Sequence, residues 1–169
     1  LNPDEVRLPE EAAWELYQPF VMRRLSQTGH KPLDGLKLIE ERADAAKKAL
    51  EAEMKERPVM VNRAPALHKY NMLTMKPMLD KSNTLKMNSF VLKNYNGDFD
   101  GDQMTIHVPV GRKAVQESWK FLPSKVLFSP ATHDFTIQPR EDALLGLNFL
   151  TSEKHTPEPQ SFKTSKDAS

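Results

Sequence analysis

Three carboxylates alternate with other residues in the middle of the chain. Asp98, Asp100 and Asp102 occupy every second position, and alternate side chains of a straight strand lie roughly 6–7 Å apart on one face. That spacing is too wide for all three to meet one ion, but Gly97 and Gly101 allow the backbone to curl so that the carboxylates converge. A carboxylate-rich oxygen ligand set that leaves room for water and phosphate oxygens is typical of Mg²⁺. The pattern therefore predicts a site for a hard divalent cation.

Two other interpretations start from the same acids. Stretches rich in Asp and Gly also form solvated turns, although a turn in water needs neither Phe99 between its acids nor the alternating apolar series at 104–110 directly behind them. A helix–loop–helix calcium site shares the first three acidic positions, but it requires Gly at its sixth position and Glu at its twelfth. Gln103 and Pro109 stand there instead, so the spacing excludes this calcium loop.

A second candidate element lies upstream, where Arg63 follows a short apolar run and precedes Pro65. The proline ring restrains the local loop and favours a fixed direction for the guanidinium group. The planar donor fork of arginine suits the hydroxyl or phosphate oxygens of a nucleotide, and a surface ion pair is the alternative role. His68, beside Leu67, is interpreted as a hydrogen-bonded structural residue.

Helices are expected to precede these elements. Leu8 and Pro9 with two following acids predict a helix start, Pro19 is expected to kink or divide that helix, and Gly29 to end it. An apolar stripe from Leu36 to Arg57 predicts one amphipathic helix closed by Pro58. These residues form the predicted helical lead-in, 1–57.

Short apolar or alternating runs then predict the strands of a small sheet or barrel, at 59–61, 84–88, 90–92 and 103–110. They make up a predicted segment, 58–111, of barrel strands with the acidic loop. Residues 112–121 and 141–150 predict helices within a third segment, 112–151, that packs on the barrel. Residues 152–169 hold little to bury and predict a flexible tail or linker.

Composition narrows the functional classes. The 24 Lys and Arg against 23 Asp and Glu give a net charge of +1, which argues against a protein that coats nucleic acid through overall charge. The chain has no cysteine, so disulfides, thiolate zinc sites and iron–sulfur clusters are excluded. No apolar run is long enough for a membrane span, and no secretory signal is visible. Leu1 stands where an initiator Met would be. We therefore expect that the numbering begins inside a longer chain, or after processing, or at an engineered start.

Several segments resemble one family in its order. Residues 96–104 are similar to the N-A-D-F-D-G-D-Q-M motif of the largest (beta-prime type) subunit of multisubunit DNA-dependent RNA polymerases, with Gly97 where Ala is usual. Residues 61–69 resemble its L-N-R-A-P-T-L-H-R, and 8–20 its L-P-x-x-x-A-x-E-L-x-x-P-F helix. Further similarity extends to about Thr151. Within this stretch, residues 140–142 differ from the sequence that the family usually has at a turn.

The resemblance implies an α+β fold that is part of a double-psi β-barrel with flanking helices, completed by other chains or by missing upstream strands. It implies that Asp98, Asp100 and Asp102 are the catalytic residues that hold Mg²⁺, that a second Mg²⁺ arrives with the nucleoside triphosphate, and that Arg63 and Asn96 recognise the ribose hydroxyls of the incoming nucleotide beside a wall shaped by Pro65.

The implied function is nucleotidyl transfer in transcription, by a DNA-directed RNA polymerase that is active only as part of a larger assembly. Implied partners are the second-barrel subunit, the remaining large-subunit segments, the DNA template, the RNA transcript and nucleoside triphosphates. The implied location is the cytoplasm of a bacterial cell or of a virus-infected bacterial cell. A split subunit and a fragment both fit the residues. A single-chain two-barrel RNA polymerase and a non-catalytic structural module of a polymerase-like complex are the alternatives.

Overall fold

The computed structural model describes residues 1–66, 69–98, 100–128, 133–139 and 141–152. The chain divides into two compact units, residues 1–138 and 139–169. The described residues combine helices with one open mixed sheet, which confirms the predicted α+β class and gives a partial barrel. The finer predicted division at residues 57, 111 and 151 stays a prediction. The predicted tail lies, apart from Ser152, outside the described residues.

Five strands form the sheet of the first unit, in the order β4-β1-β3-β2-β5. They are β1 (Glu5–Pro9), β2 (Val59–Asn62), β3 (Met72–Asp80), β4 (Lys86–Met87) and β5 (Thr105–His107). The central β3 pairs in parallel with β1 and antiparallel with β2, while β4 and β5 pair antiparallel at the two edges. The inner side chains of the three middle strands are fully buried, namely Val6, Leu8, Val59, Val61, Leu73 and Met75.

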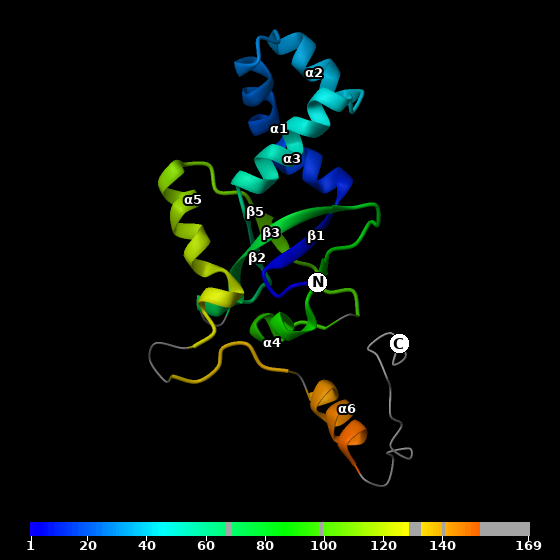
Figure 1. Ribbon diagram of the computed structural model, residues 1–169, viewed down its shortest axis with the longest axis vertical. Helices are drawn as coiled ribbons and strands as arrows, with labels where there is room; N and C mark the ends of the chain where they lie inside the picture. Colours follow the sequence, from blue (N-terminus) through cyan, green and yellow to red (C-terminus); the bar gives the residue numbers. More distant parts are fainter. Residues whose placement is uncertain (67–68, 99, 129–132, 140, 153–169) are drawn as a thin grey trace, which may run out of the picture. The chain divides into compact units, whose positions relative to one another are not determined.

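Helices α1 (Glu10–Gln27) and α3 (Asp44–Glu56) pack on one side of this sheet, and α2 (Pro32–Glu40) packs on these two helices farther from the strands, as Figure 1 shows. Buried aromatic and aliphatic side chains of α1, such as Tyr17 and Val21, pack with Leu50 of α3 in the same core as the strands. The first helix ends at Gly29, whose φ of 93° closes a Schellman motif in which the His30 N–H donates to the Leu25 carbonyl at 3.1 Å.

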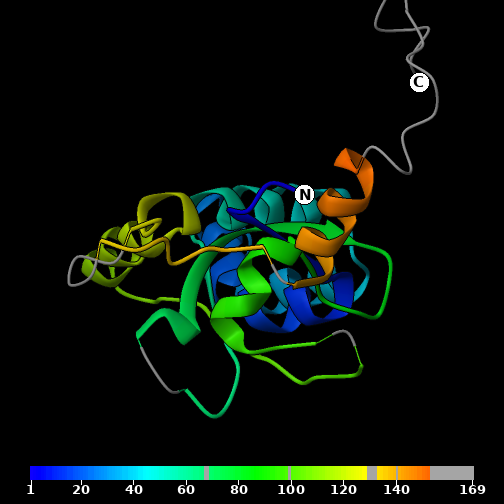
Figure 2. The same ribbon diagram turned by 90° about the horizontal axis from the view of Figure 1, so that it is seen from below.

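A short helix lies on the other side of the sheet. Helix α4 (Leu92–Tyr95) follows a single 3₁₀ turn, and the view from below in Figure 2 shows it on the side away from α1–α3. Asn88 begins this helical segment, because its side chain accepts a hydrogen bond of 2.9 Å from the Phe90 N–H. The helix therefore delivers the chain directly to the acidic segment that starts at Gly97.

The start and the end of the first unit are joined by a buried carboxylate. Asp4, only 8% exposed, accepts hydrogen bonds from the Ser124 N–H at 2.8 Å and the Ser124 hydroxyl at 2.7 Å. Ser124 belongs to a 3₁₀ turn that follows α5 (Arg112–Ser118). We call this contact the Asp4–Ser124 clamp.

Several local predictions differ from the structure. The helix expected from Leu36 to Arg57 is two helices, because the chain turns at Arg42, whose φ is 50°. The strand expected at 90–92 is helical. Helix α1 continues through Pro19 as one element and begins at Glu10, with Pro9 as its cap and the end of β1. Strands β1 and β3 were not expected.

The second unit contains α6 (Glu141–Thr151), which confirms the helix expected at 141–150. Its large apolar side chains are exposed within the described residues, and their packing against the sheet stays a prediction. None of the described helices combines the length and the apolar character needed to cross a membrane.

Candidate active site

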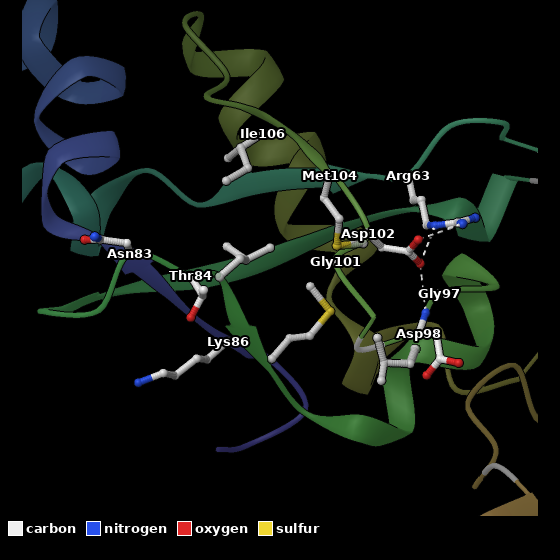
Figure 3. A pocket seen from close by; sticks show the side chains of 13 residues that line it. Arg63, Asn83, Thr84, Lys86, Gly97, Asp98, Gly101, Asp102, Met104 and Ile106 are labelled. Carbon is white, nitrogen blue, oxygen red and sulfur yellow. Dashed lines mark hydrogen bonds and ion pairs between the residues drawn. The ribbon is translucent and has the colours of Figure 1, made fainter.

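A cleft of about 660 Å³ lies where the acidic segment meets the sheet, and Figure 3 shows its lining. One wall carries Arg63, which follows β2, together with Asp98 and Asp102. The opposite wall is the segment before and within β4, from Asn83 to Met87. The cleft is called the acidic cleft below.

Arg63 and Asp102 meet in this cleft across 39 residues of sequence. The Arg63 Nε lies 2.9 Å from Asp102 Oδ2, and its Nη2 donates to Oδ1 at 3.2 Å, so the guanidinium grips both carboxylate oxygens. The two side chains are 23% and 24% exposed. The contact is therefore neither buried in the core nor free in solvent.

A third donor completes the environment of Asp102. The backbone N–H of Asp98 donates to Asp102 Oδ2 at 2.8 Å, which closes the acidic segment into a loop. The hydrogen bond from Arg63, and then that from the Asp98 N–H, lower the pKa of the Asp102 carboxyl below its ordinary value of 3.8. Asp102 is consequently held as a carboxylate.

The two glycines of the loop play different roles. Gly101 has a φ of 105°, a conformation that a side chain would strain, so the backbone curl expected there is present. Gly97 is buried and has no such φ. A Cβ at Gly97 would lie 3.6 Å from Arg63 Cδ and from Asp102 Oδ2, which is ordinary contact. Only Gly101 is required by backbone conformation.

Both free edges of the sheet border the acidic cleft. Lys86 and Met87 come from β4, Ile106 comes from β5, and all three line the cleft, although four strand pairings separate their strands in the sheet. The sheet is therefore curled so that its edges face one hollow. The predicted shared face of Met104 and Ile106 is found here, since both are partly buried against the core and line the cleft.

The structure brings together only some of the predicted site residues. Arg63, Asp98 and Asp102 line the acidic cleft, but Asp100, Asn96 and Pro65, all described and exposed, do not. Figure 3 shows the Asp98 carboxylate pointing away from that of Asp102. Among the described residues, no three His, Asp or Glu side chains are gathered closely enough to hold a metal ion. Leu67, His68 and Phe99 lie outside the described residues.

Asn96 ends α4 in the left-handed region, with φ 46° and ψ 40°. Asparagine tolerates this conformation better than most residues. The wall at 83–87 was expected as a short strand but not as part of the site. Its only local signal is the alternation of Leu85 and Met87, which predicts a strand and says nothing of what the strand faces.

We compared the sequence of the chain with known protein families. The family described as RNA polymerase Rpb1, domain 2, matches residues 36–123, more than half of the 169-residue chain. The chain belongs to the RNA polymerase Rpb1 domain 2 family. The matched range contains Arg63 as well as the acidic segment, and thus both sides of the ion pair that marks the acidic cleft.

Individual relatives of this Rpb1 domain 2 chain carry one description. The DNA-directed RNA polymerase subunit beta' of Borreliella afzelii is 39% identical over 150 residues, 87% of this chain and 11% of the relative. The proteins of the same description from Sulfurihydrogenibium sp. and Tupiella akineta are 36% identical over 156 residues and 38% identical over 155, each covering 90% of this chain and 10% of the relative. The chain thus spans about a tenth of the length of these relatives.

Proposed function

We propose that this chain is the magnesium-binding catalytic segment of a DNA-directed RNA polymerase large subunit, which performs nucleotidyl transfer in transcription within a larger assembly. The observation that carries the proposal is the meeting of Arg63 and Asp102 in one cleft. Two motifs far apart in the sequence thereby contribute to a single site, and both lie in the range matched by the family.

Asp98, Asp100 and Asp102 are proposed to hold the metal. Their donor chemistry fits, because carboxylate oxygens are the ligands that Mg²⁺ takes up in nucleotide-processing sites. Gly101 supplies the backbone freedom to turn the three side chains toward one point. The arrangement described above requires a rearrangement of the loop, in which Asp102 leaves the Arg63 guanidinium for the cation. The carboxylates of Asp98 and of Asp100, which lies outside the acidic cleft, then turn toward it.

The chain's own residues have distinct tasks in this proposal. The carboxylates place the bound ions, which supply charge neutralisation at the reacting phosphate and activation of the RNA 3′-hydroxyl. Arg63, once separated from Asp102, presents its donor fork to the ribose hydroxyls of the incoming nucleotide together with Asn96. Pro65 shapes the wall next to Arg63.

The curled sheet supports a double-psi barrel completed by another segment. Its two edge strands, β4 and β5, pair on one side only among the described residues, border the acidic cleft and present strand backbone that further strands can pair with. We propose that other polymerase segments supply these strands, with the DNA template, the transcript and nucleoside triphosphates as further partners, inside a bacterial or virus-infected bacterial cell. The beta' description of the relatives favours this over a single-chain polymerase.

The test uses the assembled polymerase that contains this chain. Asp100→Asn should abolish extension of an RNA primer on a DNA template while the chain still co-purifies with its partners. Asp34→Asn, an exposed aspartate of α2, is the matched control and should leave extension unchanged. Replacing Mg²⁺ by Fe²⁺, with hydrogen peroxide and ascorbate added to generate hydroxyl radicals at the bound iron, should cleave the backbone near residues 98–102 in the control and not in Asp100→Asn. Full extension by Asp100→Asn would refute the proposal.

A further inference from the structure

A second cleft, of about 500 Å³, lies between α1, α3 and α5 and shares no lining residue with the acidic cleft. Figure 1 shows the three helices that surround it. Four arginines line it, Arg23, Arg24, Arg57 and Arg112, against the two acids Glu53 and Glu56. The cleft is called the arginine groove below. Its excess of two positive charges exceeds the +1 of the whole chain, so positive charge is concentrated there.

Arg57, at the floor of the groove, already has hydrogen-bond partners within the chain. Arg57 donates from Nε to Glu53 at 3.0 Å and from Nη1 to the carbonyls of Pro109 and Val110 at 3.1 and 2.9 Å. Its guanidinium carbon also lies 4.3 Å from the centre of the Phe20 ring. Arg57 thus joins the end of α3 to the loop before α5 and makes the groove a fixed feature.

The rim has unused donors. Arg24 is engaged by Glu53 and Glu56, both at 2.7 Å, but Arg23 and Arg112 are exposed and form no ion pair with any described residue. They come from α1 and α5, on two different sides of the groove. Acidic groups of a bound partner would gain these guanidiniums without displacing an ion pair among the described residues.

The remaining lining indicates the kind of acidic partner. Val110 is 72% exposed and Val115 is half-buried, whereas the one aromatic ring in the groove, Phe20, is covered at 8% exposure. A single nucleic-acid strand is typically held by phosphate contacts together with base stacking on exposed aromatic rings, and the groove supplies arginines for the first but no exposed ring among its lining residues for the second. A peptide that combines carboxylates with an aliphatic side chain can pair with the exposed arginines and pack on the exposed valine, and Gln27 and Gln116 offer it further hydrogen-bonding groups. Arginine without lysine is typical of protein interfaces.

We propose that the arginine groove binds an acidic peptide segment of a partner protein. Arg23 and Arg112 contact carboxylates of that segment, and an aliphatic residue packs on Val110. This site goes beyond the proposed function, because neither the metal nor the nucleotide takes part in it.

The test measures binding of a fluorescein-labelled peptide of alternating glutamate and leucine to the full chain, in EDTA and low salt. R23E/R112E should raise the dissociation constant at least tenfold. K47E/K48E is the matched control, since both lysines are exposed on α3 outside either cleft and the charge change is the same; it should change binding by less than twofold. A peptide with lysine in place of glutamate should prefer R23E/R112E over the wild type.

Four results would overturn the proposal. One is equal wild-type affinity for the glutamate peptide and a glutamine version of it. Another is an equal loss of binding in both double variants while thermal melting shows them folded. A third is a lysine peptide that does not prefer R23E/R112E. The last is a twelve-nucleotide oligouridylate that binds the wild type more tightly than the glutamate peptide does and loses at least tenfold in affinity in R23E/R112E. The occupant would then be a nucleic-acid strand. The use of EDTA separates every outcome from the metal site.

Discussion

Two arginine–carboxylate contacts of this chain have similar chemistry and different settings. Glu53 on α3 is 10% exposed and lies between Arg24 and Arg57, at 2.7 and 3.0 Å. Asp102 is 24% exposed and meets a single guanidinium, that of Arg63. Around Glu53, Arg24 stands on α1 and Arg57 follows the last residue of α3. Arg57 is fixed further, since the Tyr17 hydroxyl donates to its carbonyl at 2.7 Å. Around Asp102 the partners stand on loops.

The difference separates a contact that holds the fold from a contact that a ligand can exchange. Removing a charge from a buried pair leaves its partner unsatisfied in a medium that solvates it poorly. Opening an exposed pair lets water replace the lost partner. The Glu53 contact is therefore part of the fold, whereas the acidic cleft keeps Asp98 and Asp102 accessible. Substitutions at the two contacts should therefore affect different properties, activity at Asp102 and stability at Glu53.

The largest effect is expected for Asp102→Asn in the assembled polymerase. The amide keeps the shape of the side chain but removes the charge that the proposed Mg²⁺ site needs, so nucleotide addition should fall on the order of a thousandfold. The urea midpoint of the chain should change little, because the lost contact is exposed. Single-nucleotide extension and urea unfolding measure the two quantities. An unchanged extension rate would remove Asp102 from the site.

Glu53→Gln should reverse this pattern. The substitution removes the charge that Arg24 and Arg57 share, while Arg24 keeps Glu56 and Arg57 keeps two backbone carbonyls, and it should lower the free energy of unfolding by about 2 kcal/mol. Glu56→Gln is the matched control, because Glu56 pairs with Arg24 at the same distance of 2.7 Å but is 64% exposed; its cost should stay below about 1 kcal/mol. Equal costs in urea denaturation would show that burial does not distinguish the two sites.

The glycines test which part of the acidic loop is conformationally required. Gly101→Ala should destabilise the chain by about 1 kcal/mol, because an L side chain at φ 105° is strained. Gly97→Ala should stabilise it by about 0.5 kcal/mol, since the position has space and the unfolded chain loses entropy. Thermal unfolding of both variants gives the comparison. Destabilisation of similar size in both would contradict it.

The smallest effect concerns pH. Arg63 holds the pKa of folded Asp102 below its unfolded value, so the contact stabilises the fold fully above about pH 4. That stabilisation is lost as the pH falls through the folded pKa. Arg63→Gln should raise the pKa of Asp102 toward 3.8, as measured by carbon NMR of the carboxyl group. An Asp102 that titrates identically in both proteins would mean that Arg63 does not perturb it.

The spacing of apolar residues predicted the elements that depend mainly on contacts between sequence neighbours. The alternation at 59–61 and the stripe at 112–121 correspond to β2 and to α5 with its following turn. Strand β3 was missed because Leu73, Thr74 and Met75 are buried in succession, so the burial does not alternate, and Pro77 is unusual inside a strand. For the helical turn at 90–92, the local indication in the sequence is Asn88, which is a favourable cap residue.

The sequence indicated some members of the candidate site but not its arrangement. Alternation of the acids and the resemblance of 96–104 indicated Asp98 and Asp102, and the loop proline indicated Arg63. The ion pair between them depends on β2 and β5 being neighbours, with Asn62 opposite Thr105, and no local pattern encodes that register. The second wall at 83–87 depends on the curl of the whole sheet for the same reason.

The pairing of β1 with β3 affects how the chain is made. Glu5 stands opposite Lys76, so the first strand leaves the ribosome about seventy residues before its parallel neighbour exists. The Asp4–Ser124 clamp closes later still. Strand β1 therefore cannot pair with β3 until residues 72–80 have been made, and the clamp forms only after Ser124 has emerged.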